Sequence, residues 1–377
     1  MTFRDPARSR SPPAPDGVDV GLLAQRAKIF AKMFAARRLG RRTVVSATLL
    51  LTNRCNMRCA YCFIDQDRPQ RELTEREWAD LIDELARRGA QSICLMGGEP
   101  LLAPFFGVLV DRVHHHGMLC EAVSNGLLVP REIEHVRKLD SLLISLDGAP
   151  EAHDYCRRNA AGGGTYRQVI AGIEAARAAG VPTRLNAVLT RKSIADIEHL
   201  LDLADRHDLF VTFSPIGVFS WQVRTSADDF LPSDAATREA LVRLKTLRQR
   251  GRRVLTSLPA LDCLIAYPAP YQKIIFPRDV VGAGFSRDFC PFGRTLLYVD
   301  ANGDFYPCPI SFKSDWFRPK SIDDGFVAAW ENLASRECVA CACPAVFDWN
   351  YVTSLRGLGH GLRTTWRQMR SRKARRE

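Results

Sequence analysis

The sequence has no long hydrophobic run. Residues 1–20 are polar and contain several prolines, without the apolar segment that a signal peptide requires. The longest apolar stretch near the start, residues 44–51, is interrupted by Ser46 and Thr48 and is far shorter than the roughly 20 residues that cross a membrane as a helix. We therefore expect no signal peptide and no membrane span, and we place the protein in the cytoplasm.

Acidic residues are scarce at both ends of the chain. Residues 1–43 hold ten Lys and Arg against three Asp, and residues 356–377 hold eight against Glu377, so each end carries a net charge of +7. The whole chain carries +11, which leaves the central 312 residues with a net charge of −3. The basic character therefore belongs to the two ends and not to the body of the protein.

Cysteine, by contrast, is abundant, with twelve residues in the chain. Disulfide frameworks are typical of short secreted domains that cannot build a sufficient core. This chain has 377 residues and 46% hydrophobic content, which suffices for a large core. In a reducing compartment the thiols stay available to bind metal.

Three of the cysteines are closely spaced. Cys55, Cys59 and Cys62 form a C-x3-C-x2-C pattern. A structural iron-sulfur or zinc site is normally closed by four protein ligands, so three thiolates leave one iron of a cubic cluster open. The pattern predicts a small molecule at the open iron. The alternative is a zinc knuckle whose fourth ligand is distant in the sequence.

Apolar runs and helical segments alternate from residue 44 onward. Thr74 with Glu77 predicts a helix start, Gly89 predicts the end of that helix, and Ser193 with Asp196 predicts another start. Six strand-helix units predict an α/β fold with a parallel sheet, and they are too few to close an eight-stranded barrel. We therefore expect a partial (β/α)6 barrel of the TIM type. The six apolar runs are 44–51, 92–96, 119–124, 142–146, 183–189 and 210–214.

Polar or glycine-rich residues follow most of these runs. Because the carboxyl ends of parallel strands meet at one face of a barrel, we expect these positions to surround one opening. They are the cysteine pattern after the first run, Gly97-Gly98-Glu99-Pro100 after the second, Asn125-Gly126 after the third, Asp147-Gly148 after the fourth, Asn186 within the fifth, and residues 215–217 after the sixth.

The cysteine pattern, with Tyr61 directly before its last cysteine, resembles the signature of the radical S-adenosylmethionine (radical SAM) superfamily. The resemblance implies a 4Fe-4S cluster whose fourth iron binds S-adenosylmethionine. It implies that one electron cleaves this molecule to a 5'-deoxyadenosyl radical, which takes a hydrogen atom from the substrate. It also implies the partial barrel as the core fold and an electron donor such as flavodoxin or ferredoxin.

The resemblance extends to candidate residues for S-adenosylmethionine. Gly97-Gly98-Glu99-Pro100 matches the element that binds the amino group in this family, because the glycines let backbone carbonyls approach an ammonium and Glu99 adds a carboxylate. Tyr61 is expected to offer its backbone to the adenine. Ser124, Asn125, Ser145, Asp147 and Asn186 resemble positions that contact the ribose or the carboxylate, although residues of these types also cap helices.

A second group of cysteines lies near the C-terminus. Cys290 is followed by Gly303 and Cys308 in a G-x4-C pattern, and then by Cys338 and Cys341 in a C-x2-C pattern. This order resembles the SPASM and twitch extensions of this superfamily, which bind auxiliary iron-sulfur clusters. A SPASM domain with two clusters needs more cysteines than the five present, so we expect a twitch-like domain with a second 4Fe-4S cluster. Its expected ligands are Cys290, Cys308, Cys338 and Cys341, with Cys343 as the alternative to Cys341. A zinc ribbon would also suit four cysteines.

The remaining motifs receive structural interpretations. Cys94 and Cys120 fall in predicted buried strands and are expected to act as small apolar residues. His114, His115 and His116 end a predicted helix, where basic side chains complement its dipole.

The expected organisation is a basic leader with an amphipathic helix (1–43), the barrel (44–232), a helical connection (233–289), the auxiliary domain (290–350) and a basic amphipathic tail (351–377). In the N-terminal helix, residues 18–38, Leu22, Leu23, Ala27, Phe30, Met33 and Phe34 cluster on one side. That side is expected to dock on a membrane or partner, or to pack on the barrel. In the tail, Leu355, Leu358, Leu362, Trp366 and Met369 recur at helical spacing among arginines, which suits anionic lipid, RNA or plain solvent exposure.

An auxiliary cluster favours a net oxidation, with no catalytic base identified. The segment before the triad is too short for a fused leader-peptide recognition domain, so a small-molecule or lipid-like substrate is preferred, with peripheral membrane contact through the basic ends as an option. One alternative is a maturase of a ribosomally synthesised peptide. An alternative of another class is a non-catalytic metal-binding module whose ends bind nucleic acid or membrane.

Overall fold

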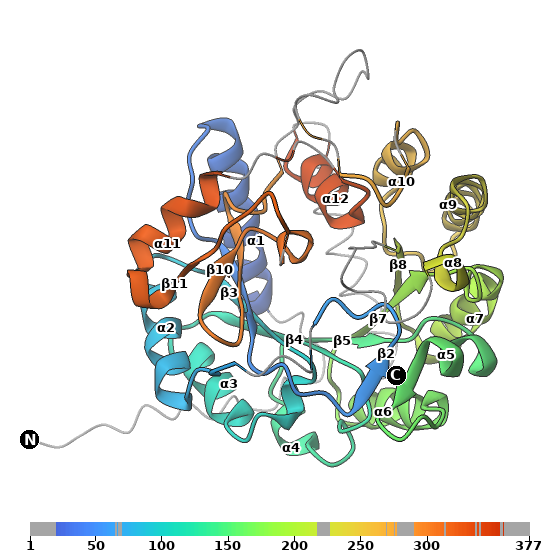
Figure 1. The fold of residues 1–377 in the computed structure, drawn as a ribbon, viewed down its shortest axis with the longest axis horizontal. Coiled ribbons are helices and arrows are strands. Elements are labelled where there is room, and N and C mark those ends of the chain that lie inside the picture. Colours follow the sequence, from blue (N-terminus) through green and yellow to red (C-terminus); the bar gives the residue numbers. More distant parts are fainter. Residues whose placement is uncertain are drawn as a thin grey trace, which may run out of the picture.

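The core of the protein is one nine-stranded sheet covered by helices on its outer face (Figure 1). The strand order is β11-β10-β9-β1-β3-β4-β5-β7-β8. The structure is a computed structural model. It describes residues 20–64, 66, 70–216, 227–268, 270–274, 276, 290–312, 314–335, 338, 341–354 and 357.

Six strands run parallel through the centre of the sheet, and each neighbouring pair is hydrogen-bonded in the order that the chain predicts. All six apolar runs are confirmed as strands, with ends within two residues of the prediction. They are β1 (Ser46–Leu50), β3 (Ser92–Met96), β4 (Leu119–Ser124), β5 (Ser141–Ser145), β7 (Thr183–Leu189) and β8 (Val211–Pro215).

Helices connect these strands and lie around the outside of the sheet (Figure 1). Alternate strand residues such as Ala47 and Leu49 are buried beneath them, whereas Thr48 between them faces inward and stays half-buried. The connecting helices are α2 (Glu75–Arg87), α3 (Phe106–His115), α4 (Ile133–Val136), α5 (Pro150–Cys156), α6 (Tyr166–Ala178) and α7 (Ile197–His207), followed by α8 (Ala227–Phe230), α9 (Asp234–Gln249) and α10 (Leu258–Ile265). The partial (β/α)6 barrel is thereby confirmed.

Helix starts were predicted with mixed success. Thr74 and Glu77 form the expected capping box at the start of α2. Ser193 does not cap a helix with its side chain, and a short 3-10 turn (Ile194–Asp196) precedes α7. The Ser193 hydroxyl instead donates to the carbonyl of Val188 at 2.8 Å, so it fastens the end of β7.

The C-terminal segment continues the sheet of the barrel. Strand β9 (Leu296–Val299) pairs in parallel with β1, and β10 (Asp304–Tyr306) and β11 (Lys320–Ser321) extend the sheet with antiparallel pairing. Gly303, with φ of +90°, makes the turn between β9 and β10. Helices α11 (Phe326–Asn332) and α12 (Pro344–Val352) follow. The second cysteine group is therefore fastened to the barrel through backbone hydrogen bonds.

The N-terminal helix α1 (Val20–Arg38) packs on the barrel, with Met33 and Ala36 buried. Lys32 donates from Nζ to the carbonyl of Val44 at 2.9 Å and to that of Gly89. Gln25 donates to the Gly117 carbonyl at 2.6 Å. These three carbonyls precede β1, β3 and β4, so α1 lies at the amino-terminal ends of the strands.

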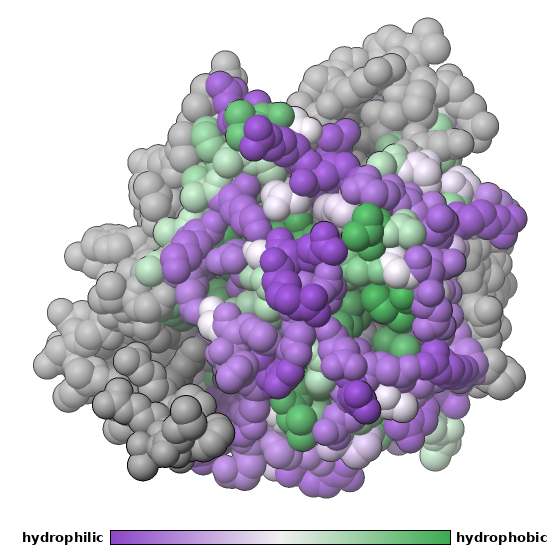
Figure 2. All heavy atoms as spheres, turned by 90° about the vertical axis from the view of Figure 1, so that its left-hand side faces the viewer, coloured by the Kyte–Doolittle hydropathy of each residue, from purple (hydrophilic) through white to green (hydrophobic). Residues whose placement is uncertain are grey.

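The surface of the described residues is mixed. Figure 2, which faces the side of α2 and α11, shows hydrophilic residues over most of the coloured area and hydrophobic residues in small groups between them. Within the described part of the chain, no helix combines the length and the apolar character needed to cross a membrane. The leader and the tail residues Leu355, Leu358, Leu362, Trp366 and Met369 lie outside the described residues.

Candidate active site

The loop after β1 brings the first three cysteines together. The thiols of Cys55, Cys59 and Cys62 lie close enough to influence one another electrostatically, and all three line one internal chamber. The amide of Met57 donates to the Cys55 sulfur at 3.4 Å, and the Asn125 side chain lies 3.7 Å from it. The loop is thus folded around these sulfurs.

A short second sheet fixes the position of this loop. Strand β2 (Met57–Cys59) pairs antiparallel with β6 (Arg157–Asn159), so that Cys59 and Arg157 are register partners. The guanidinium of Arg157 donates to the Cys59 sulfur at 3.8 Å and to the Asp147 carboxylate at 2.8 Å. The Tyr61 hydroxyl donates to the same carboxylate. Cys59 is therefore held by a buried charged network.

The Gly97-Gly98 turn fits closely against the cysteine loop. Gly97 has φ of +149°, and a Cβ there would lie 2.6 Å from the carbonyl oxygen of Thr52. A Cβ on Gly98 would overlap the carbonyl of Arg54, and the Gly98 amide donates to Thr52 O at 2.7 Å. Only glycine therefore fits at these two positions, so close to the backbone of the cysteine loop. Both glycines line the chamber.

Glu99 turns away from the chamber. Its carboxylate is fully buried and accepts hydrogen bonds from the Ser124 hydroxyl at 2.9 Å, the Asn125 amide at 2.8 Å and the Leu101 amide at 3.3 Å. Burial raises its pKa to about 7, against the opposing effect of these hydrogen bonds. Both oxygens are thus engaged within the protein, and Glu99 joins the end of β3 to the end of β4. Pro100 is buried beside it and begins a short 3-10 turn.

The other candidate residues differ in what they offer to a ligand. Ser145 and Asn186 are register partners on β5 and β7, and both line the chamber. Ser124 and Asn125 also reach it, although the Asn125 side chain already donates to Asn56 at 2.7 Å. Asp147 is buried, and although burial opposes it, Arg157 holds the pKa of Asp147 below its usual value. Asp147 thus organises the loop, while Ser145 and Asn186 face the open space.

The structure also brings the C-terminal cysteines into one group. Cys308 lies near Cys290 and Cys338, and Cys341 lies near Cys290, Cys308 and Cys343. All five line the same chamber as the first three cysteines. The thiol of Cys341 donates to Cys343, which lowers the pKa of Cys343, and backbone amides at the start of α12 act in the same direction.

The chemistry of the donors fits iron-sulfur clusters at both groups. Burial raises the pKa of Cys55 to about 11 and that of Cys59 to about 12, and it raises the pKa of Cys308 further. Such thiols bind as thiolates only when metal replaces their protons. Within the described residues the thiols do not form a compact metal site by themselves. Three thiols beside the two glycines and five beyond them are nevertheless sufficient in number for the two clusters.

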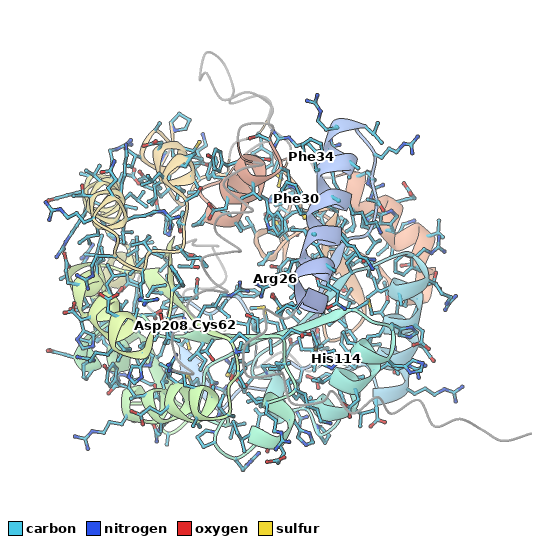
Figure 3. All side chains as sticks on the ribbon, turned by 180° about the vertical axis from the view of Figure 1, so that it is seen from behind. Arg26, Phe30, Phe34, Cys62, His114 and Asp208 are labelled. Carbon is cyan, nitrogen blue, oxygen red and sulfur yellow. The ribbon has the colours of Figure 1, made fainter. Side chains whose placement is uncertain are left out.

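The chamber joins the two groups and has a volume of about 1340 Å³. Helix α1 contributes Arg26 and Phe30 to its wall, and Figure 3 shows these residues along α1 with Cys62 nearer the centre of the molecule. Cys94, expected to be an apolar core residue, faces this chamber, although its thiol is buried enough to raise its pKa to about 12. Cys120 is fully buried as expected.

Several organising residues were not found from the sequence. Glu72 accepts from the Thr52 hydroxyl at 2.8 Å and from the Asn53 amide at 2.7 Å, which fixes the start of the cysteine loop. His153 accepts from the Asp147 amide at 3.3 Å. Burial lowers the pKa of His153 to about 4, so it is neutral. In the sequence, the only indication that His153 and Arg157 support the site is that they follow closely after the motif at residues 147–148.

Comparisons with known proteins agree with this geometry. Residues 49–204 match the model of the radical SAM superfamily. Mycofactocin maturase MftC of Mycobacterium ulcerans is 28% identical over 300 residues, which cover 76% of this chain and 74% of the relative. The PqqA peptide cyclase of Ruegeria pomeroyi is 30% identical over 267 residues, covering 68% of this chain and 66% of the relative.

Solved structures support the fold. Streptococcus suis SuiB bound to S-adenosylmethionine superposes with a TM-score of 0.61 at 17% identity, covering 83% of this chain and 71% of that one. The protein anSMEcpe with bound AdoMet gives 0.59 at 19% identity, covering 77% of this chain and 79% of that one. At 83% of this chain, the superposition with SuiB covers more residues than the barrel alone contains.

The cofactors are accordingly a 4Fe-4S cluster with S-adenosylmethionine and an auxiliary 4Fe-4S cluster. These findings favour iron-sulfur clusters over zinc, and an enzyme over a non-catalytic metal-binding module. The assignment of individual residues to each cofactor stays a prediction. Three thiols beside a glycine turn would hold a cluster with one iron open to S-adenosylmethionine, and this chain belongs to the radical SAM superfamily.

Proposed function

We propose that this enzyme matures a peptide by oxidising a ribosomally synthesised substrate in the chamber between its two cysteine groups. The relatives named above are a maturase and a peptide cyclase, which supports the peptide alternative. The small-molecule or lipid-like substrate preferred from the sequence has no comparable support. A separate protein could present the peptide to this enzyme.

The observation that carries the proposal is the single chamber lined by both cysteine groups. When bound, the cofactors supply a radical that takes one substrate hydrogen atom and an acceptor for the electron left behind. A substrate in this chamber would be close to both. Its loss of a hydrogen atom, an electron and a proton would leave an oxidised peptide.

The protein residues prepare this space. Cys55, Cys59 and Cys62 would hold the first cluster, and the backbone of Gly97 and Gly98 would approach the ammonium of S-adenosylmethionine. Ser145 and Asn186 would face its ribose or carboxylate. The second cluster would be held by Cys290, Cys308, Cys338 and either Cys341 or Cys343.

The chamber is large enough to hold a peptide segment besides the cofactors. A volume of about 1340 Å³ exceeds the range of about 300–1000 Å³ that suits drug-sized ligands. Part of it would be taken by the clusters and S-adenosylmethionine, and the rest would admit a few peptide residues. Contact of the basic ends with a membrane finds no support in the relatives and is not part of the proposal.

The experiment uses protein reconstituted without oxygen, with S-adenosylmethionine and with dithionite in place of a flavodoxin or ferredoxin. Synthetic peptides encoded by short reading frames beside the gene are added one by one. We expect one peptide to lose hydrogen or carbon dioxide as 5'-deoxyadenosine accumulates, and the Cys55→Ala variant to do neither. Formation of 5'-deoxyadenosine with every such peptide unchanged, while a lipid or metabolite is consumed, would overturn the proposal.

A further inference from the structure

Below the candidate cofactor residues, the inner wall of the barrel carries a row of polar side chains. Tyr298, Thr48, Cys94 and Glu121 are successive register partners on β9, β1, β3 and β4. Their strand neighbours are buried under the outer helices, so these four side chains point inward, and all four line the chamber. The sheet therefore presents one polar row across four strands at a single depth.

An ion pair ends this row. Arg184 on β7 reaches past β5 to Glu121, with 3.2 Å between its guanidinium nitrogen and the carboxylate oxygen. Side-chain exposure is 38% for Arg184 and 29% for Glu121, and both line the chamber. With this exposure the pair stays in contact with solvent and contributes little to stability as a plain structural contact. Its position suggests a binding role.

The depth of Arg184 separates it from the expected cofactor position. Asn186 is level with Ser145 at the carboxyl ends of the strands, near the cysteine loop. Arg184 is the preceding inward-facing residue of β7 and is level with Leu143. It therefore lies one step further from the cysteine loop, in the part of the chamber that S-adenosylmethionine would leave for the substrate.

Apart from the thiols that would bind the clusters, the charged side chains of the lining are mostly cationic. Among the described residues, the chamber is lined by five cationic side chains and two carboxylates. The buried Asp147 neutralises one of these cations, Arg157, which leaves four cationic side chains against the two carboxylates. The cationic residues are Arg26, Arg157, Arg184, Arg248 and Lys273, and the carboxylates are Glu121 and Asp348.

We propose that Arg184, oriented by Glu121, binds a carboxylate of the peptide substrate, either an acidic side chain or the C-terminal carboxylate. A guanidinium has five N–H donors in a planar fork, so it can pair with Glu121 and still bind a second carboxylate. Glu121 would hold the fork toward the chamber. The inference rests on the proposed function only in taking the ligand to be a peptide.

The test measures binding without turnover. Three short synthetic peptides carry an uncharged fluorophore and differ only in charge: one has a single Glu and an amidated C-terminus, one has Gln and a free C-terminal carboxylate, and one has Gln and an amidated C-terminus. Fluorescence anisotropy gives their affinities for the reconstituted enzyme saturated with S-adenosylmethionine. We expect a carboxylate peptide to bind about tenfold or more tightly than the neutral one, because a hydrogen bond between two charged groups is stronger than one to a neutral amide.

Variants test whether Arg184 causes the preference for a carboxylate peptide. In Arg184→Gln the ratio of affinities should fall close to one, whereas Arg76→Gln, on the exposed face of α2, should leave it unchanged. Iron content and 5'-deoxyadenosine formed without peptide report whether each variant is intact. If Arg184→Gln does not assemble, Arg184→Lys serves instead, because an ammonium lacks the planar fork and should lower the ratio.

Three results would overturn the inference. The wild-type enzyme could bind the neutral peptide as tightly as both carboxylate peptides. An intact Arg184 variant could keep the wild-type ratio. The Arg184→Gln variant could lose affinity for S-adenosylmethionine while its peptide ratio stays unchanged, which would assign Arg184 to the carboxylate of the cofactor. Failure of the proposed function would appear separately, as the absence of any modified peptide.

Discussion

Arg157 and Cys59 are paired twice, through the backbone and through their side chains. They are register partners in the two-stranded sheet of β2 and β6, and the Arg157 guanidinium donates to the Cys59 sulfur at 3.8 Å. The same guanidinium is bonded to the buried Asp147. A positive charge is therefore fixed beside one of the three sulfurs expected to bind the first cluster.

Replacing Arg157 should lower the reduction potential of that cluster. A buried cation stabilises the more negative, reduced state, and a hydrogen bond to a ligand sulfur acts in the same direction. We expect Arg157→Lys, which keeps the charge near Asp147, to shift the potential less than Arg157→Gln. Potentiometric titration followed by electron paramagnetic resonance measures both shifts.

Arg158 provides the matched control, because it is the next residue of β6 and its side chain is exposed. The Arg158→Gln variant should keep the wild-type potential. Arg157→Gln also leaves Asp147 buried without its partner, which costs about 3–5 kcal/mol, so iron content must be compared first. Equal potentials in the wild type and in intact Arg157 variants would contradict the prediction.

Much of the barrel could be predicted because short stretches of sequence are enough to indicate its strands and helix ends. Each parallel strand is a short apolar run, and the start of α2 is marked by Thr74 and Glu77 within four residues of each other. The positions after the strands could be assigned to one opening from topology alone. Ser145 and Asn186, which face the chamber at the same level, follow from this reasoning.

What could not be predicted depends on contacts between distant residues. The pairing of β9 with β1 joins residues that are about 250 positions apart, and no local pattern in either strand specifies the partner. Glu99 has the carboxylate that a ligand-binding residue needs, yet this carboxylate is buried and accepts hydrogen bonds from Ser124 and Asn125. The sequence shows that a carboxylate is present, but only the packing shows which way it points.

Variants of the two cysteine groups should differ in iron content and in the product that they form. The wild type should hold about eight iron atoms per chain, and each group alone about four. Replacing Cys55, Cys59 and Cys62 by Ala should abolish 5'-deoxyadenosine formation. Replacing Cys290 and Cys308 by Ala should leave 5'-deoxyadenosine formation in place while the oxidised peptide is lost. Iron quantitation and mass spectrometry test this, and about four iron atoms in the wild type would remove the second cluster.

Cys341 and Cys343 should behave differently from each other. Cys341 lies near Cys290 and Cys308 as well as Cys343, which favours it as the fourth ligand of the auxiliary cluster. We expect Cys341→Ala to lose that cluster and Cys343→Ala to keep it. Mössbauer spectroscopy of iron-57 protein distinguishes the variants, and the reverse result would assign Cys343 as the ligand.

Glu99 should make stability depend on pH. Its pKa is raised from 4.5 to about 7 by burial, so the folded protein holds this proton more tightly than the unfolded chain. The stabilisation is complete below about pH 4.5 and is lost as the pH rises to about 7, which places the change between these values. In Glu99→Gln the amide cannot titrate, and its NH2 group would face the Asn125 amide, so the variant is less stable at low pH.

The difference in thermal unfolding temperature between wild type and Glu99→Gln should therefore shrink as the pH rises from about 5 to about 8. Measurements without oxygen, at equal iron content, keep cluster loss from contributing. Glu134→Gln, on the exposed side of α4, is the control and should show a constant difference. A difference that stays constant for Glu99→Gln would contradict the raised pKa.

Lys32 should hold α1 against the barrel. Its ammonium bonds the carbonyls of Val44 and Gly89, and burial lowers its pKa, which indicates that it points into the protein. We expect Lys32→Ala to increase hydrogen exchange in α1, because the helix loses its hydrogen bonds to two carbonyls of the barrel. Lys28→Ala, on an exposed position of the same helix, should leave exchange unchanged. If Lys32→Ala also leaves it unchanged, α1 is held by the packing of Met33 and Ala36 and not by this lysine.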